Sequence, residues 1–326
     1  MRTLTWCSGL ALVAAIGCGD DSSTGASGGG GSGGDASGGA PSGGAPAGGG
    51  GSDDGGGGQV TGGGGGGGGA EPLDVEIPFE VRVGALPAEC GQNYETLGAE
   101  PADVELSDLR FYIHDVRLVD AEGTEVPVVL AQDGTWQHEN VALLDFEDAV
   151  GACEGGTAEL NQRIRGTVPA GDYQGIAFRV GVPFELNHED VATSPSPLNV
   201  TTLFWTWGFG HVFFSVITSA TPIKGGDANQ HFVHLGSTGC TGDPELGEVV
   251  SCTSPNRPAF SFDGFDPTTS SVVLNLEPLL VDSHLSTEVG CHSFPDTPAC
   301  VTPFAAFGID YATGELTPDQ TIFSVE

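Results

Sequence analysis

The most unusual segment of the sequence, residues 203–214, contains two of the four tryptophans, Trp205 and Trp207. Side chains two positions apart on a β-strand lie on the same face. An extended segment would therefore place both indoles together, with Phe204 and Thr206 opposite. Aromatic side chains dominate the energetics of protein cores. The spacing alone favours core packing and leaves a functional role for the indole pair as the alternative.

Histidine is the second residue type that could do chemistry here. Met1 is the only methionine and the cysteines are expected to pair, so a soft-metal site would have to use imidazole nitrogens. His231 and His234 are three residues apart and point to opposite faces of a strand, which argues against one shared metal ion. A ligand set would have to be assembled across loops, which spacing does not reveal. The eight histidines are His114, His138, His188, His211, His231, His234, His284 and His292.

The cysteines predict disulfides rather than a metal site. Cys7 lies in the expected leader and Cys18 at its end, and an even number remains, which is typical of disulfide pairing in an exported domain. The absence of a CxxC pair in the sequence argues against zinc. Short loops favour the pairs Cys240–Cys252 and Cys291–Cys300, which leaves Cys90–Cys153 as the third pair.

Charge and composition limit the function classes. With 44 acidic and 9 basic residues the formal net charge is −35, which excludes a nucleic-acid binder and argues against docking on anionic lipid through basic side chains. The 54 glycines are concentrated between residues 19 and 69. Residues 18–70 are expected to form a disordered Gly/Ser-rich tether, because such a composition buries too little apolar surface to offset chain entropy. Residues 71–326 are long enough for one large domain.

Residues 1–17 are typical of a secretory leader, with Arg2 followed by an apolar run that is too short to span a bilayer. Residues 15–18 read Ala-Ile-Gly-Cys and resemble a bacterial lipobox, which predicts a lipoprotein signal peptide and a lipidated Cys18. An ordinary cleaved signal peptide is the alternative. The expected location is the cell envelope, periplasmic or at the outer-membrane surface, with membrane contact through the lipid anchor only.

Elsewhere the hydrophobic pattern is mostly of period two in short runs, separated by clusters of Gly, Pro, Asn and Asp. This pattern predicts an all-β domain, an antiparallel β-sandwich with long disulfide-stapled loops. Residues 104–109 are the one place where a helical turn is considered. The expected strands lie at 75–83, 109–119, 126–130, 141–146, 176–180, 203–217, 232–235, 272–276 and 322–325.

Several runs carry, in order, a resemblance to a known family. They read FYI at 111–113, LLDF at 143–146, GDY at 171–173, GVPFELNH at 181–188, PLN at 197–199, FWTW at 204–207 and HLGSTGC at 234–240. The chain resembles the MbnP-like family, exported four-cysteine proteins of the metallo-mystery pair system, from about residue 75 to residue 325.

The resemblance implies a copper-binding protein rather than an enzyme. It implies as partner a di-haem, MauG-like cytochrome c peroxidase that oxidises a tryptophan to kynurenine, with Trp205 and Trp207 as the candidates. His188 and His234 are the expected histidine ligands, although His234 could instead fix the Cys240 loop by a hydrogen bond. Opening an indole ring leaves an aryl amine and a ketone, which can ligate a metal or bond to a ligand.

One departure from the family pattern follows the WxW motif. The family usually has Gly-Tyr-Lys where this chain reads Gly210-His211-Val212. If the tyrosine assists oxidation or packing, its loss puts the modification in question. Alternatively, His211 adds a metal ligand beside the tryptophans, or it is a strand residue that faces solvent.

Two other functions compete with copper binding. One is a metal-dependent enzyme using the carboxylates of Asp145, Glu189 or Asp190, but the sequence has no HExxH, triad signature or diagnostic carboxylate pair. A solvated acidic surface explains these residues better. The other is a metal-free surface or interaction module on a flexible stalk.

Overall fold

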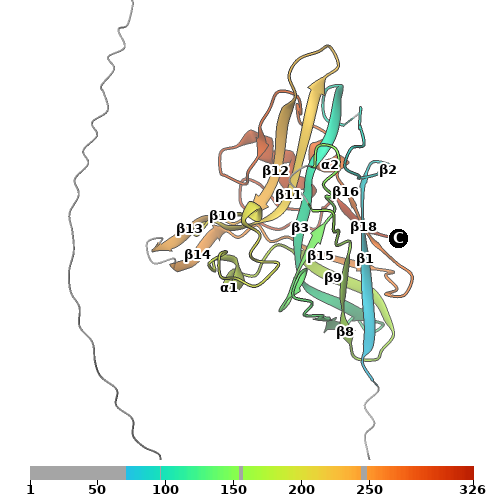
Figure 1. Cartoon of the computed structure of the whole chain (residues 1–326). Coiled ribbons are helices and arrows are strands. Elements are labelled where there is room, and N and C mark those ends of the chain that lie inside the picture. Colours follow the sequence, from blue (N-terminus) through green and yellow to red (C-terminus); the bar gives the residue numbers. More distant parts are fainter. Residues whose placement is uncertain (1–70, 96, 154–156, 244–247) are drawn as a thin grey trace, which may run out of the picture. The chain divides into compact units, whose positions relative to one another are not determined.

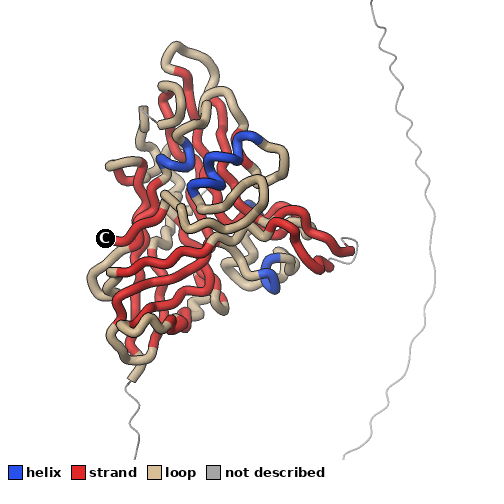
Figure 2. Tube along the Cα trace, turned by 180° about the vertical axis from the view of Figure 1, so that it is seen from behind, coloured by secondary structure: helices blue, strands red, loops and turns tan. Residues whose placement is uncertain are grey.

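The computed structural model describes residues 71–95, 97–153, 157–243 and 248–326. The expected leader 1–17, the lipidation site Cys18 and the tether 18–70 lie outside the described residues. Among the residues that are described, no helix is both long and apolar enough to cross a membrane. The chain is built mostly from strands joined by long loops, with short helical segments (Figure 2).

Two sheets and one hairpin make up the described fold (Figure 1). The first sheet has the order β18 (Phe323–Val325), β16 (Val272–Asn275), β1 (Leu73–Val83), β8 (Arg163–Val168), β5 (Val129–Leu130), with β2 (Leu86–Pro87) on β1. The second has the order β15 (Ala259–Asp263), β9 (Tyr173–Val180), β3 (Ala102–Asp120), β11 (Gly210–Pro222), β12 (Asn229–Gly236), β17 (Gly290–Cys291). Joined to the second sheet are β4 (Glu125–Pro127), β6 (Gln137–His138), β7 (Val141–Asp145) and β10 (Phe204–Thr206), and the separate hairpin is β13 (Thr238–Asp243) with β14 (Glu248–Ser254). The helical segments are α1 (Phe184–Asn187), α2 (Glu277–Leu280), α3 (Val301–Ala306) and two 3₁₀ turns, η1 (Thr201–Leu203) and η2 (Pro298–Cys300).

Aromatic side chains hold the two sheets together. Phe79 of β1 packs edge-on against Phe111 of β3 and Phe178 of β9, with ring centroids 6.3 and 5.6 Å apart. Phe323 of β18 contacts the same two rings. All four side chains are buried. Along β1 these buried positions alternate with exposed or half-buried ones, as the period-two pattern of the sequence predicts, and the predicted β-sandwich is confirmed.

Strand β3 corrects one local expectation. Residues 104–109, considered as a helical turn, are part of this 19-residue strand. Val104 and Leu106 are buried on one face of the sheet. β3 pairs with β11 over its first half, from Ala102 to Phe111, and with β7 and β9 further along. Pairing of this segment with β11, together with burial of its apolar face, outweighs its weak local preference.

The sheets are not antiparallel throughout. β1 runs parallel to β16, with Phe79 opposite Val272, and β12 runs parallel to β17, with Val233 opposite Cys291. The other strand pairs are antiparallel in the described residues.

The segment expected as one strand over 203–217 is broken into a hairpin. The short β10 ends at Thr206, a turn follows, and β11 begins at Gly210 and pairs back on β10. Gly210 has φ +78°, and a Cβ there would lie 2.4 Å from the Asn187 carbonyl oxygen. Glycine is therefore required on conformational and steric grounds, and it turns the chain within the aromatic motif.

The structure contains the two disulfides that the short loops favour, Cys240–Cys252 and Cys291–Cys300, and the remaining pair, Cys90–Cys153. Cys240 and Cys252 lie directly opposite each other in the β13–β14 hairpin. Cys291 belongs to β17, so its bond to Cys300 ties this short edge strand to the start of α3.

Candidate functional site

Strands β12 and β17 bring together two histidines that are far apart in the sequence. Because Val233 pairs with Cys291 in parallel register, the next residues, His234 and His292, lie side by side. Their Nδ1 atoms are 3.1 Å apart and their ring centroids 4.9 Å apart. Phe232 packs against both rings and fixes their orientation. The sequence predicts His234 as a ligand but does not single out His292.

Burial keeps both rings neutral near pH 7. It lowers the pKa of His234 to about 4, and a charge on His292 would lower it further. Burial also lowers the pKa of His292. One Nδ1–H can donate to the other Nδ1, while Nε2 of His234 is buried without a hydrogen-bond partner in the described structure. Histidine binds metals as the neutral imidazole, so both rings are in the form that a ligand needs.

Trp205 lies against this pair. Its ring centroid is 6.4 Å from that of His234, and the indole stacks on Phe294 at 5.7 Å with Phe209 at its edge. A Cβ on Gly236, at the end of β12, would come within 2.6 Å of the indole. Glycine at this position thus makes room for Trp205 beside the histidines.

Trp207 occupies a different environment. It lies in the turn after β10, is 37% exposed, and meets Phe204 edge-on. Its carbonyl oxygen accepts a hydrogen bond from Nδ1 of His188. The expectation that both indoles share a face opposite Phe204 is wrong, because the strand ends at Thr206 and its alternation stops there.

His188 lies beside a disulfide instead of beside His234. Its Nε2 is 3.1 Å from Nδ2 of Asn187 and 3.6 Å from Sγ of Cys252. Burial lowers the pKa of His188. His188, Cys240 and Cys252 have their ligand atoms within 4.8 Å of one another. In the described part of the chain they are the one such group of three or more His, Cys, Asp or Glu side chains. The structure therefore does not gather the predicted ligand set into one site.

His211 is fully buried, so the alternative that it faces solvent is wrong. Its Nδ1 lies 3.1 Å from the carbonyl oxygen of Asn187, and its Nε2 lies 3.0 Å from that of Leu198. Both ring nitrogens thus lie against backbone carbonyl oxygens, one of which accepts the ring N–H, and neither nitrogen is aimed at a metal. The side chain of Asn187 accepts the backbone N–H of His211 and contacts His188, so this motif asparagine positions both histidines.

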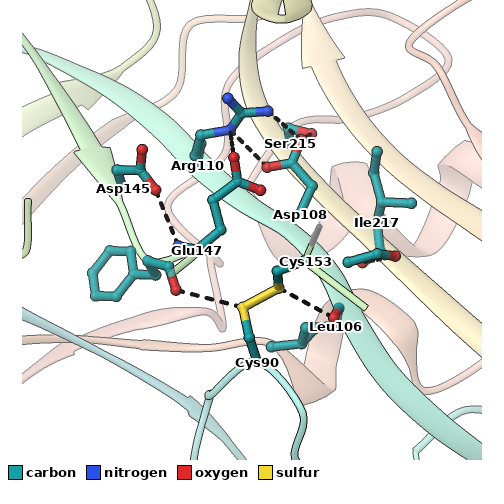
Figure 3. A network of polar contacts seen from close by, with 11 residues as sticks. Cys90, Leu106, Asp108, Arg110, Asp145, Glu147, Cys153, Ser215 and Ile217 are labelled. Carbon is teal, nitrogen blue, oxygen red and sulfur yellow. Dashed lines mark hydrogen bonds and ion pairs between the residues drawn. A yellow bond between two sulfur atoms is a disulfide. The ribbon is translucent and has the colours of Figure 1, made fainter. Parts of the chain in front are cut away.

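Asp145, considered above as a catalytic carboxylate, belongs to a buried network (Figure 3). Arg110 Nε is 2.8 Å from Asp108 Oδ1 and 3.0 Å from Glu147 Oε1. Ser215 donates to Asp108, and Asp145 accepts the backbone N–H of Glu147. Burial raises the pKa of Asp145 to about 6. Burial and the charge of Asp108 raise the pKa of Glu147 to about 8. These contacts account for Asp145 as part of the folded core.

Glu147→Gln is expected to stabilise the protein at pH 8 and to have little effect near pH 4.5. The pKa of Glu147 rises from 4.5 to about 8 on folding. Between these values the unfolded chain has released a proton that the native state keeps, so stability falls as the pH rises. Glutamine removes this loss of unfolding free energy. A pKa shift of one unit or more corresponds to at least about 1.4 kcal/mol, which should raise Tm by roughly 2–4 °C. Thermal unfolding between pH 4.5 and pH 8 measures it. The exposed Glu122→Gln is the control, and parallel curves for wild type and Glu147→Gln would contradict the prediction.

The two-sheet fold and the paired imidazoles define a β-sandwich protein with a candidate metal centre. A family model described as MbnP matches residues 72–293, and the chain belongs to the MbnP family. The solved structure of MbnP from Methylosinus trichosporium is similar, with 33% sequence identity and a TM-score of 0.69, over 78% of this chain and 98% of that one. A comparison with curated protein sequences gives no match.

Proposed function

We propose that this chain is an exported, lipid-anchored copper-binding protein without catalytic activity of its own. His234 and His292 bind the metal, and Trp205 beside them is oxidised to kynurenine by a di-haem, MauG-like cytochrome c peroxidase. Membership of the MbnP family and the resemblance of the motif runs support the general function. The Nδ1 atoms of His234 and His292, 3.1 Å apart beside Trp205, are the observation that carries the assignment to this site.

The donor set fits copper. Imidazole suits copper ions, and two nitrogens 3.1 Å apart can bind one ion at metal–nitrogen distances of roughly 2.0–2.1 Å, as in zinc–histidine sites. Burial supplies the neutral form that a ligand needs. Phe232 and the Cys291–Cys300 disulfide hold the two rings in place, so little ordering remains to be done on binding.

Trp205 is the better candidate for oxidation than Trp207. An indole offers one N–H and no lone pair suited to a metal. Cleavage of its C2–C3 bond is a four-electron oxidation that consumes two molecules of hydrogen peroxide, each of which transfers one oxygen atom and leaves as water. Hydrolysis then releases the formyl carbon as formate and leaves an aryl amine and a ketone. At Trp205 these groups arise next to His234, whereas Trp207 points into a different environment.

Purification from the native host, followed by peptide mass spectrometry and metal analysis of one sample, tests the proposal. We expect kynurenine at Trp205, an intact Trp207, and bound copper that survives dialysis. Protein expressed without the peroxidase is the control and should carry neither. Copper with both tryptophans intact would leave a plain histidine site and overturn the modification. Two intact tryptophans without copper would favour the metal-free interaction module on a stalk.

A further inference from the structure

A second group of metal-ligating side chains lies apart from the histidine pair, where the β13–β14 hairpin meets the α1 segment (Figure 1). Cys240 and Cys252 face each other across the hairpin and form its disulfide. His188 directly follows α1, and its Nε2 is 3.6 Å from Sγ of Cys252. The three ligand atoms all lie within 4.8 Å of one another.

The surroundings fix the tautomer of His188. Its Nδ1 is 3.1 Å from the carbonyl oxygen of Trp207, which can only accept, so Nδ1 carries the proton. Nε2 is then the basic nitrogen, with Nδ2 of Asn187 donating to it, and it lies against the disulfide. Nε2 is thus placed next to the two sulfur atoms by contacts that do not involve the disulfide, and a metal ion bound to it would replace the hydrogen bond from Asn187.

The disulfide is accessible from solvent. Cys240 and Cys252 are half-buried, whereas Cys153, Cys291 and Cys300 are buried. A surface pocket reaches Cys240, lined also by Gly208, Thr241, Gly242, Glu248 and Val249. A reductant can therefore approach this bond while the other two disulfides each keep at least one sulfur in the interior.

We propose that reduction of the Cys240–Cys252 disulfide converts these two cysteines and His188 into a binding site for one soft metal ion, Cu(I) or Zn(II). An external dithiol is oxidised to its disulfide and supplies two electrons and two protons, and the Cys240–Cys252 bond opens to two thiols. The metal ion then displaces both thiol protons to solvent. Two thiolates and one imidazole form a donor set that selects soft cations. The site is independent of His234 and exists only in the reduced protein.

The test uses the full chain under anaerobic conditions. A brief dithiol treatment is followed by desalting, and alkylation with mass mapping identifies the opened cysteines. The protein is then titrated with Cu(I) and, in a second arm, with Zn(II). We expect Cys240 and Cys252 to be alkylated first, and reduced protein to bind one more metal ion than oxidised protein. The ion that binds more tightly in these two titrations is the one assigned to the site.

Variants separate this site from the histidine pair and from general effects of reduction. The double variant Cys240→Ser/Cys252→Ser should lose the additional ion, and His188→Gln should weaken its binding by at least about 10-fold. His234→Ala should keep it, so that failure of the copper proposal above leaves this result unaffected. Circular dichroism and thermal unfolding establish that each variant is folded. Three results would each overturn the proposal. The oxidised and reduced proteins could bind the same amount of metal, His188→Gln could bind the metal as tightly as the wild type, or the Cys240–Cys252 bond could open only when the whole protein unfolds.

Discussion

His234→Ala is expected to abolish copper binding by the oxidised protein. His234 contributes one of two nitrogens 3.1 Å apart, and its other nitrogen is buried without a partner. Alanine removes both and leaves His292 as the single imidazole of the pair. Loss of groups that merely orient a metal ligand lowers affinity about 10–100-fold, so loss of the ligand itself should exceed about 100-fold. Competition with a chromophoric copper chelator measures the affinity.

The matched control is His188→Ala, which removes another buried histidine of the same family motifs. Because His188 lies beside the Cys240–Cys252 disulfide and not beside His234, the oxidised variant should bind copper like the wild type. His292→Ala should weaken binding as His234→Ala does. Copper lost in His188→Ala and retained in His292→Ala would show that the pair described here is not the site.

Removal of the Cys90–Cys153 disulfide is expected to cause the largest loss of stability among the three. Its cysteines are 63 residues apart, and in the chain-entropy relation closing a loop of that length contributes about 4 kcal/mol. The bond joins the loop after β2 to the segment after β7, and the sulfur of Cys153 lies 3.3 Å from the Leu106 carbonyl oxygen of the central strand β3 (Figure 3). Cys90→Ala/Cys153→Ala should lower Tm by roughly 8–16 °C.

Cys291→Ala/Cys300→Ala is the control, because the cysteines of this bond are only 9 residues apart. The same relation gives about 3 kcal/mol for it. Denaturant unfolding of the three proteins measures the difference. A loss below about 1 kcal/mol for the long loop would mean that the reduced, unfolded chain retains structure in this region.

Much of the fold could be predicted from the sequence because the two faces of its strands differ in polarity. Ile77, Phe79 and Val81 of β1 are buried and alternate with residues that are exposed or half-buried, which is the pattern from which the strand is predicted. The short loops between neighbouring cysteines likewise favour the pairs that form. The local pattern fails to predict the secondary structure where strand pairing determines it, as for residues 104–109, which belong to β3.

The candidate site could be predicted only in part. The motif runs point to His234 and to the tryptophans, but His292 becomes its neighbour through the register of two parallel strands, Val233 opposite Cys291. The sequence feature that could have pointed to His292 is its place directly after Cys291, because a disulfide at Cys291 restrains the backbone that carries the histidine. The different surroundings of Trp205 and Trp207 follow from the turn before Gly210, whereas the sequence pattern suggests a continuous strand.

The parallel pairing of β1 with β16 constrains the order in which the molecule can assemble. β1 is among the first segments of the domain to be synthesised, yet Phe79 meets Val272 and β16 in turn pairs with β18 at the end of the chain. Sheets closed by such distant partners fold slowly, because loop entropy is lost before the contacts form. The first sheet therefore cannot be completed until β16 and β18 have been synthesised.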